Sequence, residues 1–69
     1  MSETIQQTLG RHVHTARKAS GLSKVDFSLQ MGISRVSLDL IESGNANIKL
    51  STLSKLAERM GTEPWRLIR

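Results

Sequence analysis

The sequence contains no cysteine, which excludes both a disulfide bond and a thiolate metal site. It also lacks a signal-peptide pattern and any apolar run near the 18 residues that a membrane-spanning helix needs. From these absences we expect a soluble, cytoplasmic protein. The two histidines, His12 and His14, are two positions apart and would point to nearly opposite sides of a helix, so they cannot share a metal ion. We therefore expect neither a metal nor a cofactor.

The sequence is also poor in the residue patterns on which enzymes depend. It has no pair of carboxylates at a suitable spacing, no nucleophile with a plausible base, and no glycine-rich phosphate loop. A chain of 69 residues also has little room for a substrate pocket. We predict that the protein is not an enzyme and that residues 1–69 form a single domain.

Basic residues, in contrast, are in excess. Ten lysines and arginines against six acidic residues give a net charge of +4. The excess lies toward the two ends of the chain, because residues 23–44 hold two basic and three acidic residues. A small basic domain indicates a polyanionic partner, with nucleic acid first and an anionic membrane surface second.

Apolar residues recur at helical spacing along nearly the whole chain, and no segment alternates long enough for a strand. Ser23, Ser34 and Thr62 stand where helix N-caps are expected, and Gly32 and Gly61 stand where helices end. The pattern predicts an all-α domain of five short helices. The apolar residues that define them are Ile5, Leu9, Val13 and Ala16; Phe27 and Met31; Leu38 and Ile41; Leu50, Leu53, Leu56, Ala57 and Met60; and Trp65, Leu67 and Ile68.

The connection between the second and third expected helices is the most informative segment. It reads Met31-Gly32-Ile33-Ser34: one glycine, one apolar residue that should point inward, and one N-cap. Such a turn makes two short helices cross steeply. This is the layout of a helix-turn-helix, whose second helix, here about residues 35–43, can lie in the major groove of DNA.

The residues of this segment carry a resemblance to a known family. The pattern Leu22-Ser23-Lys24, Phe27-Ser28, Met31-Gly32-Ile33-Ser34-Arg35, Leu38 and Ile41-Glu42-x-Gly44 resembles the helix-turn-helix of the phage repressor and Cro family of transcriptional regulators. That family includes restriction–modification controller proteins and antitoxin-type regulators. The likeness continues through residues 50–61 and covers about residues 9–68. It implies a five-helix repressor-like domain with the helix-turn-helix at helices 2 and 3.

The resemblance also implies a function and partners. We expect a homodimer that binds a palindromic operator in double-stranded DNA, rather than a membrane, and acts as a repressor or autoregulatory controller. An alternative stays open: an antitoxin or protein-interaction module that uses the same fold to hold a partner protein such as a toxin.

Roles for individual residues follow from the same resemblance. Arg17, late in the first helix, is expected to pair with Glu42 and to hold the recognition helix against it. Trp65, Leu67 and Ile68 are expected at a dimer interface. Base-edge contacts are expected from Ser34, Arg35, Val36, Asp39 and Leu40, and phosphate contacts from Ser23, Lys24, Ser43, Asn45, Asn47 and Lys49.

Several of these roles have a plainer alternative. Arg35 can fork onto guanine or touch only a phosphate, and Val36 and Leu40 can meet thymine methyls or another protein. Asp39 can accept a hydrogen bond from cytosine, although we favour a role in orienting Arg35. The serine and asparagines after the recognition helix also suit a turn that binds no ligand.

Overall fold

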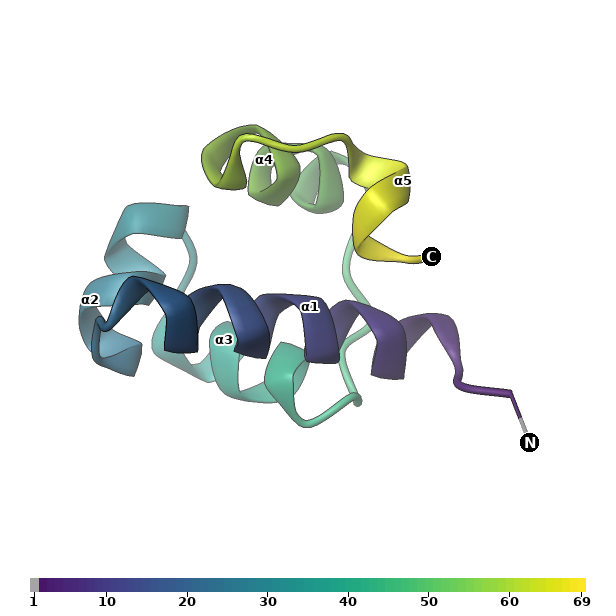
Figure 1. The fold of residues 1–69 in the computed structure, drawn as a ribbon, viewed down its shortest axis with the longest axis horizontal. Coiled ribbons are helices and arrows are strands. Elements are labelled where there is room, and N and C mark those ends of the chain that lie inside the picture. Colours follow the sequence, from purple (N-terminus) through teal and green to yellow (C-terminus); the bar gives the residue numbers. More distant parts are fainter. Residues whose placement is uncertain (1) are drawn as a thin grey trace.

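The computed structural model describes residues 2–69 and contains five α-helices, with no strand among those residues (Figure 1). This confirms the predicted all-α class. No helix in the described part of the chain is long and apolar enough to cross a membrane. The helices are α1 (Ile5–Ser20), α2 (Lys24–Met31), α3 (Arg35–Glu42), α4 (Leu50–Met60) and α5 (Pro64–Leu67).

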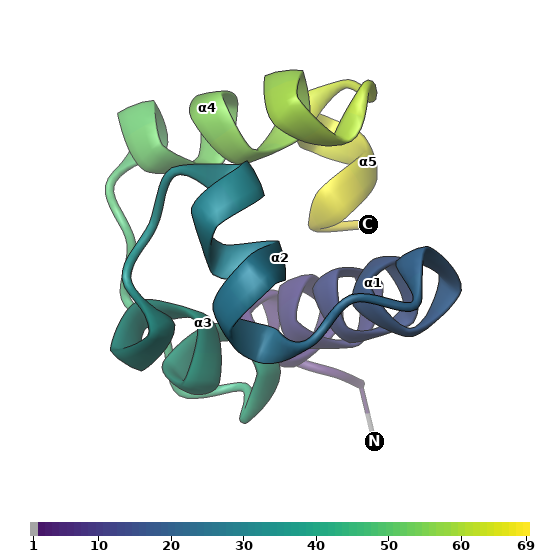
Figure 2. The same cartoon turned by 90° about the vertical axis from the view of Figure 1, so that its left-hand side faces the viewer.

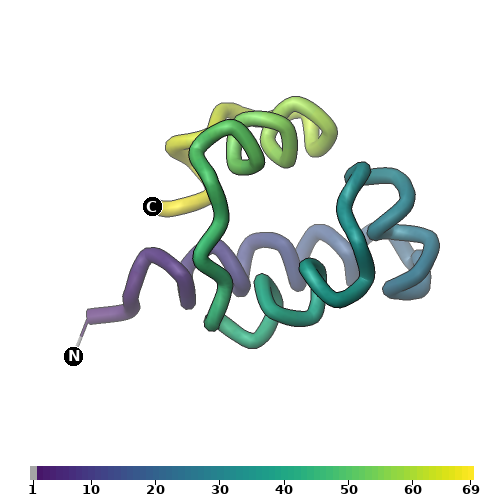
Figure 3. The backbone as a smooth tube through the Cα atoms, turned by 180° about the vertical axis from the view of Figure 1, so that it is seen from behind, coloured from purple at the N-terminus to yellow at the C-terminus, as the bar shows by residue number. Residues whose placement is uncertain are grey.

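The helices surround a single apolar core. α1 runs along the length of the molecule and packs against α3, while α2 contacts both α3 and α4 (Figures 1 and 2). The short α5 packs on α4 and returns to α1. The segment 43–49 carries the chain from the end of α3 to the start of α4 (Figure 3). The core residues with no exposed surface are Val13, Leu38, Ile41, Leu56 and Ala57.

Local sequence signals explain most helix ends. The hydroxyls of Ser23 and Ser34 each accept a hydrogen bond from a backbone N–H three residues further on, as an N-cap does. Gly32 ends α2 in the left-handed conformation, with a φ of +71°. The predicted cap at Thr62 is wrong, because Glu63 precedes α5 and makes no side-chain cap.

Two positions of the apolar stripes predicted for α1 and α4 lie outside the core. Ile5 is 60% exposed and Leu50 is 81% exposed. Each is the first residue of its helix, beyond the part that a neighbouring helix covers. Periodicity therefore predicted the correct helices but assigned too much burial to their first turns.

Gly10 explains how closely α1 approaches α3. It is buried in the middle of α1, where glycine lowers helix stability by up to about 1 kcal/mol relative to alanine. A Cβ atom at this position would lie 2.3 Å from the carbonyl oxygen of Ile41. Only glycine leaves room for the end of α3, so α1 can support the helix-turn-helix at close range.

Candidate nucleic-acid interface

The turn between α2 and α3 is held from both sides. The backbone N–H of Ile33 donates to the Ser28 carbonyl at 3.0 Å, which closes the end of α2. From α4, Lys55 Nζ donates to the Gly32 carbonyl at 2.9 Å and Arg59 donates to the Gln30 carbonyl at 3.1 Å. Cations suit this place because a helix C-terminus carries partial negative charge. The fourth helix thus holds the C-terminal end of α2 and the glycine of the turn.

One side of α3 faces the protein. We call Leu38, Ile41 and Glu42 its inner face. The first two side chains are completely buried in the core, and only 7% of the Glu42 side chain is exposed. Packing therefore determines how α3 is rotated about its own axis.

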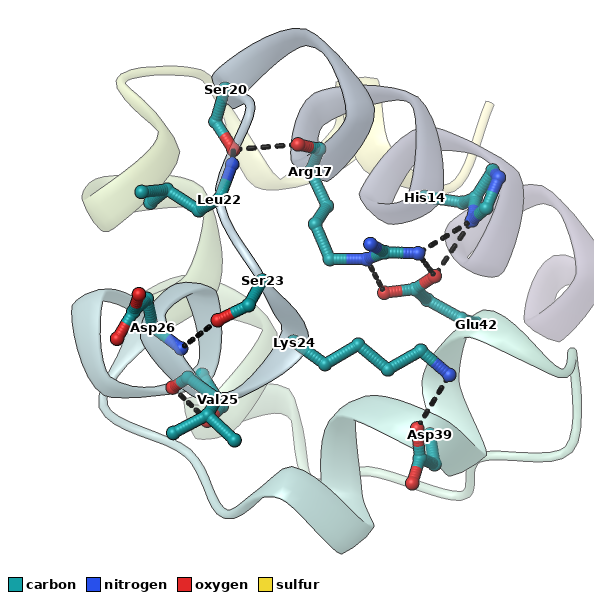
Figure 4. Close-up of polar contacts among 11 residues, drawn as sticks. His14, Arg17, Ser20, Leu22, Ser23, Lys24, Val25, Asp26, Asp39 and Glu42 are labelled. Carbon is teal, nitrogen blue, oxygen red and sulfur yellow. Dashed lines mark hydrogen bonds and ion pairs between the residues drawn. The ribbon is translucent and has the colours of Figure 1, made fainter.

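Glu42 is held by two side chains from α1 (Figure 4). Arg17 donates from Nε to one carboxylate oxygen at 2.8 Å and from Nη2 to the other at 3.0 Å, so the predicted ion pair is present. His14 Nδ1 lies 2.7 Å from Glu42 Oε1. Burial acts to raise the pKa of Glu42, but the bonds and charges of Arg17 and His14 outweigh it and lower that pKa overall. The carboxylate is thus charged at neutral pH and ties α3 to α1.

The contribution of His14 was not predicted from the sequence. The signal was present, because His14 is three residues before Arg17 and so lies on the same side of α1. The position of His14 predicts a contact only when the partner carboxylate is already known.

The opposite side of α3 faces solvent. We call Ser34, Arg35, Val36, Asp39 and Leu40 its outer face, and it contains every residue predicted to contact bases. Val36 is 69% exposed and Leu40 is 48% exposed, which is unusual for apolar side chains without a partner. Arg35 is exposed and forms no ion pair or side-chain hydrogen bond with another described residue. These side chains are free to contact a ligand.

Asp39 makes a different contact from the expected one. Its carboxylate does not orient Arg35; instead it accepts a hydrogen bond from Lys24 Nζ at 2.9 Å (Figure 4). Lys24 is the first residue of α2, so its side chain spans the gap between the two helices of the motif. The structure therefore pairs a residue predicted to contact phosphate with a residue predicted to contact a base.

The segment after α3 is partly engaged in its own turn. The Ser43 hydroxyl donates to the Leu40 carbonyl at 2.8 Å, and the Asn45 amide donates to that hydroxyl at 3.1 Å. Asn47 and Lys49 are exposed and have no side-chain hydrogen bond to another described residue. Asn47 and Lys49 lie in the second half of the segment that connects α3 to α4, and Ser43 and Asn45 lie in its first half.

Residues 13–64 match the model of a family described as helix-turn-helix. The chain belongs to this family. It is the Cro and repressor type of helix-turn-helix, a class of DNA-binding transcriptional regulators, as the sequence pattern indicated.

A solved structure supports the fold of this helix-turn-helix domain. The hypothetical transcription factor NHTF from Neisseria superimposes with a TM-score of 0.85 and 24% sequence identity. The match covers 100% of this chain and 80% of that chain. A search of curated proteins finds no match.

The C-terminal residues of the helix-turn-helix domain divide into two groups. Leu67 is 3% exposed and belongs to the core, so we correct its predicted place at a dimer interface: it has almost no surface to offer a partner. Trp65 is 47% exposed, and Arg66 and Arg69 each lie 5.2 Å from its ring centroid. Ile68 is half-buried and lines an open apolar hollow of about 190 Å³. The interface prediction is therefore reduced to Trp65 and Ile68.

Proposed function

We propose that this protein is a sequence-specific transcriptional regulator that places α3 in the major groove of double-stranded DNA. One observation carries the proposal: Arg35, Val36 and Leu40 on the outer face of α3 are exposed and make no ion pair or side-chain hydrogen bond with another described residue, while the inner face is held by the core and by α1. A helix that is fixed in rotation and free on one side suits base contact.

Each outer side chain has a plausible base partner. Arg35 in the first turn can donate two hydrogen bonds to guanine O6 and N7, and Val36 and Leu40 can contact thymine methyl groups. Phosphate contacts then fall to Ser23 and to the segment that contains Asn47 and Lys49. With one arginine and two apolar residues, recognition depends more on methyl groups and DNA shape than on many hydrogen bonds.

We further propose that the protein acts as a homodimeric repressor or autoregulatory controller on a palindromic operator. Trp65 and Ile68 are the residues that we assign to the dimer. Two helices in successive turns of the major groove, about 34 Å apart, bind far more tightly than one helix that contacts a few base pairs.

Selection of bound duplexes from a random DNA pool tests this proposal. We expect a palindrome with two half-sites, and an affinity that falls steeply as salt increases, because bound phosphates release counterions. Sedimentation of the purified protein checks the dimer independently. A protein that binds no duplex at low salt would contradict the proposal, whatever its oligomeric state.

The exposed apolar pair on the outer face favours a second candidate function. Val36 and Leu40 also suit a protein partner, as in an antitoxin that holds a toxin. The variant Leu40→Asp should then lose a stoichiometric partner that co-purifies with the unmodified protein. Retention of that partner by Leu40→Asp would argue against this candidate.

A further inference from the structure

The ion pair between Lys24 and Asp39 joins a side chain expected to contact a phosphate to a side chain expected to contact a base. These two kinds of contact are normally made by separate residues. Lys24 opens α2 at a place suited to a phosphate contact, and Asp39 lies on the outer face of α3 (Figure 4). In the free protein the two charges neutralise each other at 2.9 Å. As long as they do so, Lys24 presents little net charge to a nearby phosphate.

The pair is accessible and easily opened. The side chain of Lys24 is 38% exposed and that of Asp39 is 46% exposed, and ion pairs in such surroundings contribute little stability. The neighbouring pair between Arg17 and Glu42 differs, since its side chains are 13% and 7% exposed. Only the outer pair can therefore exchange its partners without disturbing the fold.

The chemistry of the major groove determines what can replace Lys24. A carboxylate accepts hydrogen bonds and cannot donate them. Guanine offers two acceptors in the groove and thymine offers one acceptor and a methyl group, so both repel Asp39. Adenine offers its N6 amino group, but beside the acceptor N7, an arrangement that suits an amide better than a carboxylate. Cytosine offers only its N4 amino group, the usual partner of an acidic side chain.

We propose that Asp39 is a specificity-determining residue that exchanges Lys24 for the amino group of a cytosine in the operator, which releases Lys24 to bind a phosphate. On a sequence without that cytosine, Asp39 keeps Lys24 and the phosphate contact is not made. The inference rests on the proposed DNA-binding function. It makes one phosphate contact dependent on sequence, whereas such contacts ordinarily carry no sequence information.

A double-mutant cycle measured on two duplexes tests the exchange. The proteins are the unmodified chain, Lys24→Gln, Asp39→Asn and the double variant; the duplexes are the selected operator and a scrambled duplex of equal length. Dissociation constants are measured across a salt series. In the unmodified background, Lys24→Gln should reduce the salt slope by about 1.8 on the operator, about 0.9 for each protomer of the proposed dimer, and leave it unchanged on the scrambled duplex.

Asp39→Asn should free Lys24 on every sequence. We expect this variant to bind the scrambled duplex more tightly and to lose about tenfold of its preference for the operator. In the Asp39→Asn background, Lys24→Gln should reduce the slope on both duplexes. Lys49→Gln is the matched control, because Lys49 has no partner among the described residues and should act equally on both duplexes in both backgrounds.

The possible failures can be told apart. If Lys24→Gln reduces the slope equally on both duplexes in the unmodified background, or if Asp39→Asn leaves scrambled binding unchanged, the exchange is wrong although DNA binding stands. If the unmodified chain binds neither duplex, the proposed function and the exchange fail together. Melting curves of all variants should coincide, since both side chains are partly exposed.

Discussion

The two faces of α3 differ in what determines their residues. Leu38 and Ile41 on the inner face have no exposed surface, and Glu42 beside them is held by two side chains of α1. On the outer face, Val36 and Leu40 are exposed. Packing explains the inner residues, whereas no contact within the described residues requires Arg35, Val36 or Leu40 on the outer face.

The difference between the two faces should therefore appear in two separate measurements, the free energy of unfolding and the affinity for DNA. Changes on the inner face, or in the part of α1 that supports it, should lower the free energy of unfolding. Changes on the outer face should alter DNA binding while stability stays constant. A domain of this size is stabilised by roughly 3–10 kcal/mol in total, so the first kind of change is easy to detect.

Leu38→Ala should have the largest effect, because it leaves a cavity at the centre of the core. We expect the free energy of unfolding to fall by about 4 kcal/mol, measured by urea denaturation followed by circular dichroism. The matched control is Leu40→Ala, two positions away on the outer face, which should cost less than about 0.5 kcal/mol. Equal losses in the two variants would show that the two faces are not distinct.

Arg17→Met should come next. The substitution keeps most of the side-chain volume but leaves the Glu42 carboxylate, 7% exposed, without its main partner. Removing one partner of such a pair should lower the free energy of unfolding by more than the loss of an ordinary surface pair does. Lys18→Met, at the adjacent exposed position of α1, should cost almost nothing in the same denaturation experiment. A loss below about 1 kcal/mol for Arg17→Met would mean that the pair behaves as an ordinary surface pair.

Gly10→Ala should destabilise the domain by about 2 kcal/mol, since the new methyl group would meet the Ile41 carbonyl oxygen at 2.3 Å. Gly21→Ala is the control: nothing lies within 4 Å of its Cβ position, so it should cost only about 1 kcal/mol for its left-handed φ of +72°. The variant Gly10→Ala should also weaken the Arg17 contact by moving α1 away from α3. Its effect should therefore not add fully to that of Arg17→Met, and strict additivity would contradict this coupling.

The pH dependence of stability also tests the contact between Arg17 and Glu42, with a smaller expected change in the free energy of unfolding. The pKa of Glu42 is lowered from its ordinary value of 4.5, so the folded state binds this proton less readily than the unfolded state. The stabilisation is therefore fully present above pH 4.5 and is lost as the pH falls through the lowered pKa. We expect the difference in unfolding free energy between the unmodified chain and Glu42→Gln to shrink below pH 4.5. A difference that stays constant down to pH 2 would contradict the pKa shift.

Local sequence signals predicted the helices and the ion pair because these depend on short spacings or on a family pattern. Gly32 ends α2 through its left-handed backbone and Ser34 begins α3 through its side-chain cap, so the two residues define the turn of the motif. The resemblance placed Arg17 opposite Glu42, and the structure contains that pair.

The remaining features depend on distances between helices, which the spacing of residues along the sequence does not determine. The need for Gly10 appears only when α3 is placed against α1. The contact of Asp39 with Lys24 depends on the crossing of α2 and α3. The burial of Leu67 depends on how α5 returns to α1. Sequence reasoning named Lys24, Asp39 and Leu67 but could not assign their partners.

Arg35→Ala should have the smallest effect on stability and should therefore isolate the outer face. Arg35 is exposed and has no ion pair or side-chain hydrogen bond to another described residue, so unfolding should change by less than about 0.5 kcal/mol. If Arg35 contacts a guanine, operator affinity should fall about tenfold or more. Competition with single-base operator variants should then show that the preference for guanine is lost at one position of each half-site. If Arg35 binds only a phosphate, affinity for all sequences should fall alike and the salt slope should drop by about 1.8, about 0.9 for each protomer of the proposed dimer. The two contacts thus give different results in one experiment, and only the first makes Arg35 a base-contacting residue.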